Sequence, residues 1–155
     1  MATSSLPVVS TVATLYGLVH DKLRDVVRGL DDEALNWSPG PETNSIAVLV
    51  IHTLGSELDT LHRVRAIEAA RDRDAEFAVT GATRAELLAA LDRADERLAE
   101  HAAAITEDEL AEMRVGVRSQ EQLGLYWLLF NYGHAREHLG HVELTAQLWN
   151  ADQGE

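Results

Sequence analysis

Three histidines in the C-terminal part of the chain have a spacing that suits metal binding. His134 and His138 are four residues apart, and His141 follows three residues later. In a helix this spacing places all three imidazoles on one face. The same face is the one expected to point into a helical bundle, where imidazoles are costly to bury without a partner. A bound metal ion is the simplest such partner.

His52 is the best candidate for a further ligand, because it faces away from the apolar side of its own helix. That apolar side carries Val50, Leu54 and Leu58, so His52 is expected to face a polar cavity. Three histidines plus water form the open coordination sphere of catalytic zinc, and such an ion polarises a bound group or lowers its pKa. Nitrogen ligands without sulfur suit Zn, Ni, Fe or Cu, and the sequence does not choose among them.

Other polar and aromatic residues are expected to surround this site. Asp59 lies two turns beyond His52, and Trp127 shares the helix face of His134; we expect both to line the pocket, and Asp59 to be able to orient an imidazole. For His141 the spacing allows a fourth ligand, a partner of a ligand imidazole or a group at the cavity edge, and we favour the second. The remaining histidines are expected to be surface or rim residues: His20, His62 and His101.

The segment from His134 to His138 also matches the H-x-x-E-H motif of zinc peptidases, with Glu137 as general base. Peptidases of that kind take an acidic third ligand well downstream, and only 17 residues follow His138. A peptidase is therefore disfavoured, and a metal-dependent hydrolase is kept as an alternative. Serine chemistry has no support, because the chain has no G-x-S-x-G motif and no phosphate-binding loop.

The composition limits both partners and chemistry. The net charge of −13, from 13 basic and 26 acidic residues, argues against a nucleic-acid partner. The absence of cysteine excludes disulfides, thiolate metal sites and a cysteine nucleophile, and it fits a cytoplasmic location. The start of the chain has no basic region followed by an apolar run, so no signal peptide is expected. The longest apolar run, Ile46 to Ile51, is too short to cross a membrane.

Four long amphipathic helices are predicted to position these residues. Capping residues and apolar spacing predict the ranges 7–30, 45–70, 83–105 and 119–150. The third and fourth helices open with the capping boxes Thr83-x-x-Glu86 and Ser119-x-x-Gln122, and a further box at Thr106 predicts a short helix. No strand of any length is predicted. The 155 residues are therefore expected to form one domain, an all-α four-helix bundle whose connectivity the loop lengths do not determine.

Three short motifs occur in a characteristic order along the chain. They are Leu35-Asn36-Trp37 followed by Pro39, Asn44-Ser45-Ile46 leading into His52, and His134-x-x-x-His138-Leu-Gly-His141-Val-Glu-Leu. Their order and separation resemble the DinB/YfiT-like superfamily of small bacterial metal-binding bundles, whose helices run up-down-down-up. The resemblance implies that His52, His134 and His138 bind a divalent ion such as Zn or Ni. Relatives often carry glutamine at the position of His141, which leaves its contact with the metal open.

The resemblance also implies a function that depends on a small thiol. Some members of the superfamily are similar to thiol transferases that use mycothiol or bacillithiol, including maleylpyruvate isomerase. The expected chemistry is binding of the thiol to the metal, which lowers the thiol pKa from about 8.5 and prepares it to attack an electrophile. The alternatives are a non-catalytic metal-binding protein for stress or sequestration, and a structural bundle whose imidazoles bond to one another and to water.

A homodimer is expected on two grounds. Members of the superfamily are often dimeric, so the resemblance implies it. The second predicted helix is also apolar on all sides at its start, and the first has a wide apolar stripe. Either surface can pack against a second copy of the chain.

Overall fold

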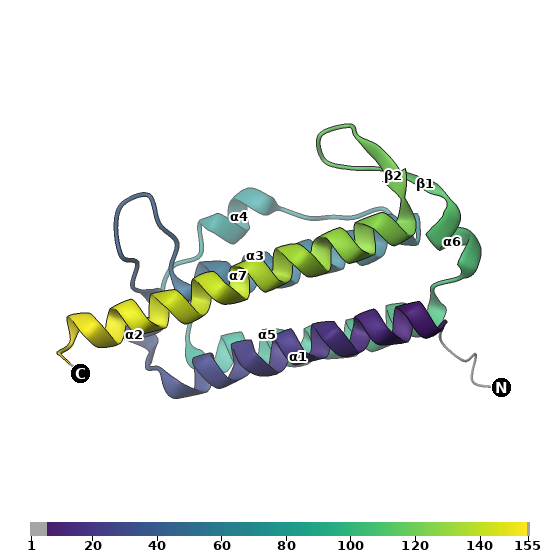
Figure 1. Ribbon diagram of the computed structural model, residues 1–155. Helices are drawn as coiled ribbons and strands as arrows, with labels where there is room; N and C mark the ends of the chain where they lie inside the picture. Colours follow the sequence, from purple (N-terminus) through teal and green to yellow (C-terminus); the bar gives the residue numbers. More distant parts are fainter. Residues whose placement is uncertain (1–5, 155) are drawn as a thin grey trace.

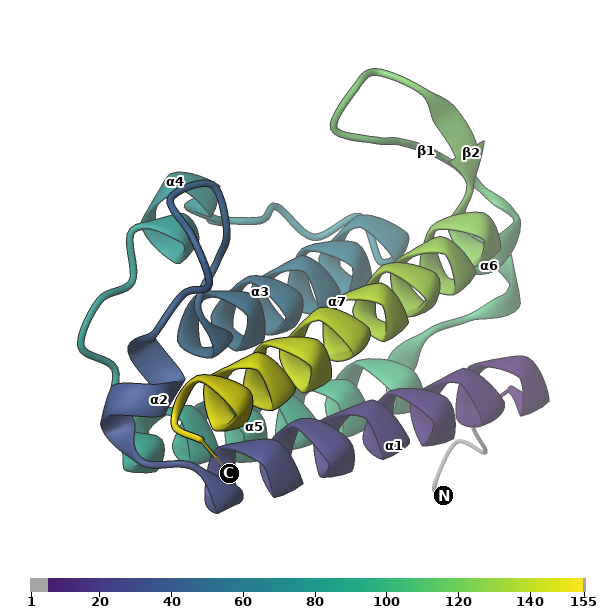
Figure 2. The ribbon, with the colours of Figure 1, turned by 60° about the vertical axis from the view of Figure 1, so that its left-hand side comes forward.

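Four long helices lie side by side in the computed structural model, which describes residues 6–154 (Figure 1). They are α1 (Pro7–Gly29), α3 (Ile46–Val64), α5 (Arg84–Ala104) and α7 (Gly124–Asp152). α1 and α3 each pack against both α5 and α7. α1 and α7 run in one direction and α3 and α5 in the other (Figures 1 and 2), which confirms the all-α, up-down-down-up bundle.

Three short helices lie in the connections: α2 (Asp32–Asn36), α4 (Arg73–Phe77) and α6 (Glu107–Ala111). The side chains of Asp31 and Asp72 accept hydrogen bonds from the first turns of α2 and α4, and so begin these helices. The predicted capping boxes at Thr83 and Thr106 are both formed. Local sequence signals thus account for most helix starts.

Two predicted boundaries are wrong. The second long helix ends at Val64 rather than near residue 70, and Ala66 just beyond it has a φ of 53°. The chain around Ser119 does not cap a helix. It forms the turn of a hairpin between β1 (Met113–Val115) and β2 (Glu121–Leu123), in which Ser119 has a φ of 62°.

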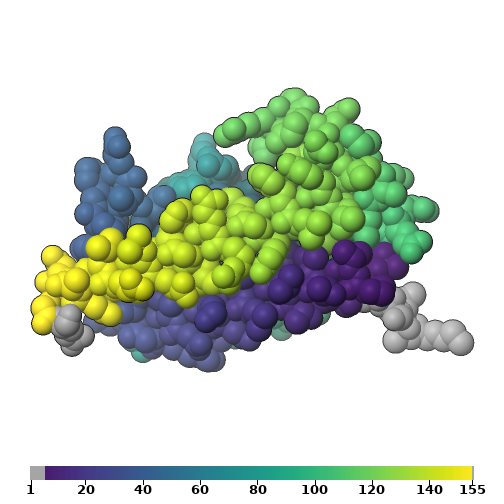
Figure 3. All heavy atoms as spheres, viewed as in Figure 1, coloured from purple at the N-terminus to yellow at the C-terminus, as the bar shows by residue number. Residues whose placement is uncertain are grey.

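The hairpin rises above the beginning of α7 (Figure 3) and is anchored there by a tryptophan. The indole Nε1 of Trp127 donates a hydrogen bond to the Arg114 carbonyl at 2.9 Å. A side chain at Gly116 would collide with the Trp127 ring, so glycine is required for the hairpin to sit this close. These contacts depend on Trp127, eight residues beyond Ser119 and inside α7, which is why the local Ser-x-x-Gln pattern did not predict the hairpin.

The all-round apolar start of α3 is buried within this chain. Residues from Ile46 to Val50 are 0–5% exposed, because neighbouring elements cover every side of that turn. This surface therefore no longer supports the expected homodimer, which stays a prediction. No helix in the described part of the chain has both the length and the apolar character needed to cross a bilayer.

A histidine lies between two carboxylates in the bundle core. His20 of α1 is fully buried, with its Nε2 2.8 Å from Glu57 Oε2 on α3 and its Nδ1 2.7 Å from Asp95 Oδ1 on α5. The expectation that His20 is a surface or rim residue is wrong, and His101 is likewise buried at 6% exposure. The spacing within one helix did not show which neighbouring helices cover each face.

The three groups of this cluster shift one another's pKa. Burial alone lowers the pKa of His20, but the hydrogen bonds and charges of Glu57 and Asp95 outweigh it, so the pKa is raised. Burial raises the pKa of Glu57 despite the nearby imidazole. Burial also acts to raise the pKa of Asp95, but bonds with His20 and Arg24 lower it overall. The folded protein therefore holds the His20 proton more tightly than an unfolded chain does.

We expect this cluster to make folding stability fall as the pH rises. His20 and Glu57 both bind protons more tightly in the folded state. The contribution of Glu57 is complete below its ordinary pKa of 4.5 and is lost as the pH rises through its folded pKa, whereas that of His20 is complete below 6.5 and is lost as the pH rises through the folded pKa of His20. Asp95 acts oppositely, but only below 3.8. The free energy of urea unfolding should fall more steeply between about pH 6 and about pH 9 in wild type than in His20→Gln/Glu57→Gln. Parallel pH profiles would contradict a protonated His20.

Candidate metal centre

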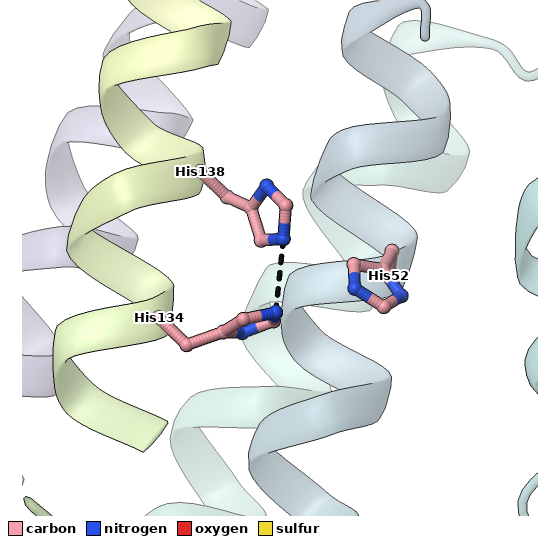
Figure 4. Close-up of side chains that lie close together, drawn as sticks. All are labelled: His52, His134 and His138. Atoms are coloured by element: carbon pink, nitrogen blue, oxygen red, sulfur yellow. Dashed lines mark hydrogen bonds between the residues drawn. The ribbon is translucent and has the colours of Figure 1, made fainter. Parts of the chain in front are cut away.

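α3 and α7 pack against each other and bring three imidazoles together (Figure 4). His134 and His138 lie on successive turns of α7, and His52 faces them from α3. Each ring offers one nitrogen, and these nitrogens all lie within 4.8 Å of one another. The structure thus groups the three histidines that the sequence singled out as candidate ligands.

The spacing of the three rings suits a single cation. Nε2 of His138 lies 3.0 Å from Nε2 of His134, and the His52 ring centroid is 5.3 Å and 5.0 Å from those of His134 and His138. Nitrogens that share one tetrahedral zinc ion lie about 3.4 Å apart. In the described part of the chain, His134 Nδ1 is also one of two buried side-chain nitrogens without a hydrogen-bond partner. That Nδ1 is the outer nitrogen of the ring, since Nε2 faces His138, so it is the set of three imidazole donors that fits a metal ion.

All three imidazoles are held in the neutral form that metals bind. Burial lowers the pKa of His52 and His134, in His134 together with the charge of His52. Burial and the neighbouring imidazoles lower the pKa of His138 to about 4. Neutral imidazoles present lone pairs to a cation without first releasing a proton.

A carboxylate from α4 orients His52. Glu76 Oε2 lies 2.9 Å from His52 Nδ1, and Arg71 holds the same carboxylate through Nε and Nη2 at 2.7 Å and 2.8 Å. A carboxylate on one ring nitrogen fixes the tautomer and leaves the other nitrogen for a metal. Sequence reasoning missed Glu76, because it falls in the connection between the predicted helices 45–70 and 83–105. The available signal was Asp72, a helix-capping residue four positions before Glu76.

The other predicted site residues lie around the three rings. His141 is exposed, and its Nδ1 is 3.3 Å from His138 Nδ1, on the ring nitrogen that does not face His134. It thus touches a candidate ligand but lies outside the three-nitrogen group. Trp127 and Asp59 line the pocket beside His52. The Asp59 carboxylate accepts a hydrogen bond from Arg63 at 2.8 Å. Glu76, rather than Asp59, is the carboxylate that orients the His52 imidazole.

A glycine in α3 leaves space for the Glu76 carboxylate. A side chain at Gly55 would collide with Glu76. We expect Gly55→Ala to displace Glu76 from His52 and weaken zinc binding by about 10- to 100-fold, the usual effect of losing such a partner. Gly17→Ala is the matched control, because Gly17 is also helical and has no atom near its missing side chain. Calorimetric zinc titrations that give equal affinities for the two variants would contradict this role of Glu76.

The chain belongs to the DinB superfamily, whose family model matches residues 16–142. A comparison with curated proteins gave no match. Solved structures with the same fold include a conserved protein from Enterococcus faecalis, with a TM-score of 0.77, 14% identity, and coverage of 93% of this chain and 98% of that one. A DinB-like protein from Bacillus cereus has a TM-score of 0.73, 10% identity, and coverage of 97% and 95%.

An enzyme is also among the structures with this fold. The mycothiol-dependent maleylpyruvate isomerase has a TM-score of 0.66 and 14% identity, and the similarity covers 86% of this chain and 60% of that one. The shared part is therefore the bundle, and the isomerase chain extends well beyond it. At these identities the comparisons establish the fold of a DinB-like protein.

Proposed function

We propose that this protein binds a divalent metal ion, zinc or nickel, through His52, His134 and His138, and transfers a low-molecular-weight thiol such as mycothiol or bacillithiol to an electrophile. The observation that carries the proposal is the convergence of three imidazole nitrogens within 4.8 Å. Membership of the superfamily and a fold shared with a mycothiol-dependent enzyme support the choice of a thiol as co-substrate.

The residues of this chain have separate tasks in such a reaction. His52, His134 and His138 would hold a divalent ion, which would lower the pKa of a bound thiol and so favour the nucleophilic thiolate. Glu76 keeps His52 in one orientation through Nδ1. Asn131 lines the pocket and is fixed by Tyr16, whose hydroxyl donates to it at 2.7 Å, and by Ser56, which accepts from it at 2.8 Å. Trp127 and Phe130 add apolar surface to the wall of the pocket.

The open pocket beside the imidazoles favours a catalytic role over sequestration. Its volume is about 540 Å³, and His52 and His134 form part of its wall. A storage site needs a closed coordination sphere, whereas a catalytic site keeps a position open to substrate. Peptidase chemistry is again disfavoured, since Glu137 is exposed.

Metal analysis is the experiment that tests the proposal. We expect about one equivalent of metal in wild type purified without a nickel column, and almost none in His134→Ala. His62→Ala is the matched control, because His62 is a partly buried histidine outside the three-nitrogen group, and it should keep the metal.

A cobalt-substituted sample then separates catalysis from storage. We expect addition of a thiol to produce a sulfur-to-cobalt charge-transfer band in wild type. Metal binding without this band would favour sequestration. Absence of metal from wild type, even after reconstitution, would overturn the metal site and the transferase together.

A further inference from the structure

The pocket beside the candidate metal centre is basic, although the chain as a whole is acidic. The protein has a net charge of −13, with 13 basic and 26 acidic residues. Among the described residues that line this pocket, four are arginines and one is a carboxylate, Asp59. Basic side chains gathered in a cleft raise the local concentration of anions. The four arginines are Arg63, Arg71, Arg73 and Arg118.

Two of the arginines are already neutralised by carboxylates of the protein. Arg63 donates to Asp59 at 2.8 Å and lies over the Trp127 ring at 5.3 Å from its centroid. Arg71 binds Glu76 through two nitrogens. These two guanidinium groups therefore form part of the pocket wall and the support of His52.

The other two arginines have no carboxylate partner within 6–154, the residues that the structure describes. Arg73 begins α4, and its guanidinium lies over the Phe77 ring at 4.7 Å. Arg118 lies in the turn of the hairpin. Two separate connections thus each supply an exposed, uncompensated guanidinium to one pocket. The planar fork of a guanidinium matches a carboxylate, which it binds through two parallel hydrogen bonds.

The hairpin that carries Arg118 is attached to both helices of the site. Arg114 Nε donates to the Val64 carbonyl at the end of α3 at 3.1 Å, and Trp127 of α7 donates to the Arg114 carbonyl. Within the turn, Gly116 N donates to the Gln120 carbonyl at 2.7 Å. Figure 2 shows the hairpin and α4 on the same side of the α3 and α7 pair. The fold therefore holds both free arginines beside the imidazoles.

We propose that this pocket binds a carboxylate-bearing small molecule, and that Arg73 and Arg118 select for its negative charge. A role of this molecule in thiol transfer rests on the proposed function, whereas binding of the anion depends only on the residues of the pocket. Trp127 and Phe130 provide apolar contact for the body of the ligand. The inferred substrate class is thus an acidic thiol, or an acidic electrophile, rather than a neutral one.

Three matched probes separate the thiol from the carboxylates. Glutathione carries both, its diethyl ester carries the thiol without the carboxylates, and S-methylglutathione carries the carboxylates without a free thiol. Binding of each probe to zinc-loaded wild type, Arg73→Gln/Arg118→Gln and Arg93→Gln would be measured by calorimetry. Arg93 is an exposed arginine of α5 that does not line this pocket. Its replacement controls for the change in net charge.

We expect the double variant to lose roughly 10- to 100-fold in affinity for glutathione and S-methylglutathione, with little change for the diethyl ester. Arg93→Gln should behave as wild type for all three probes. Equal affinity of wild type for glutathione and its diester, or equal losses in the double variant and Arg93→Gln, would overturn the inference. S-methylglutathione needs neither a thiolate nor the metal, so its binding would also be measured on metal-free protein. A loss in the double variant there would support the anion site even if the metal analysis failed.

A related series identifies which reactant carries the charge. The same double variant would be assayed by following thiol consumption with an acidic and a neutral electrophile of matched structure, fumarate monoamide and fumaramide. A loss of selectivity for the acidic electrophile, with unchanged glutathione binding, would place the carboxylate on the acceptor. Loss of glutathione binding would place it on the thiol. Unchanged behaviour in both assays would exclude a role for these arginines.

Discussion

Addition of zinc to metal-free protein is expected to raise the thermal unfolding midpoint of wild type by roughly 8–16 °C, and that of His138→Ala hardly at all. A ligand present at about 1,000 times its dissociation constant stabilises the folded state by about 4 kcal/mol. In a domain of this size each kcal/mol corresponds to about 2–4 °C. Removing one of three ligands should weaken zinc binding by roughly 1,000-fold, which leaves only about 0.4 kcal/mol of this stabilisation. Differential scanning calorimetry with and without zinc measures the effect.

His141→Ala is the control that distinguishes loss of a metal ligand from loss of a residue that only contacts a ligand. His141 touches His138 through Nδ1 at 3.3 Å and lies outside the three-nitrogen group. We therefore expect His141→Ala to retain most of the zinc-dependent increase, with a loss in affinity of no more than about 10-fold. If His141→Ala lost as much as His138→Ala, a fourth ligand would have to be added to the site. Equal shifts in wild type and His138→Ala would argue against His138 as a ligand.

His20→Leu is expected to cost about 3–5 kcal/mol of folding stability, the range observed when one partner of a buried ion pair is removed. Glu57 is 2% exposed, and His20 Nε2 is its hydrogen-bonding partner at 2.8 Å. Without His20 the carboxylate must remain charged and unpaired in the core, or take up a proton, and both outcomes lower stability. Urea unfolding near neutral pH measures the loss.

Two further variants test whether the loss of stability comes from the Glu57 carboxylate that is left without a partner. The double variant His20→Leu/Glu57→Leu should recover most of the stability, because two apolar side chains replace the pair without leaving a buried charge. Asp95→Asn should cost less than His20→Leu, because the Asp95 side chain is 43% exposed and water partly replaces its contacts. A double variant as unstable as the single one would show that packing, rather than charge, controls the site.

α3 connects the two polar clusters without mixing them. His52 faces His134 and His138 on α7, whereas Glu57 faces His20 on α1. The two groups differ in their charge state, since the pKa of His52 is lowered and that of His20 is raised. The first group therefore presents lone pairs to a cation, and the second forms a charged link between helices. The same residue type serves binding in one cluster and structure in the other.

Much of the fold and of the candidate site follows from spacing within single helices. The four-residue step from His134 to His138 places both rings on one face, and the same argument turns His52 away from its apolar stripe. Capping signals at Ser45, Thr83 and Thr106 mark real helix starts. These features depend on hydrogen bonds and periodicity over a few residues, so the sequence is sufficient to predict them.

The tertiary structure decided which distant residues meet. Glu76 reaches His52 across the connection after α3, His20 lies between Glu57 and Asp95, and Arg118 joins Arg73 at one pocket. Ser119 lies in a turn instead of a helix cap because Trp127 and Val64 bind the hairpin next to it. Such contacts depend on how the helices pack and where their connections return. Periodicity along one helix carries no information about that packing, so the candidate ligands were found from sequence and their supporting charges were not.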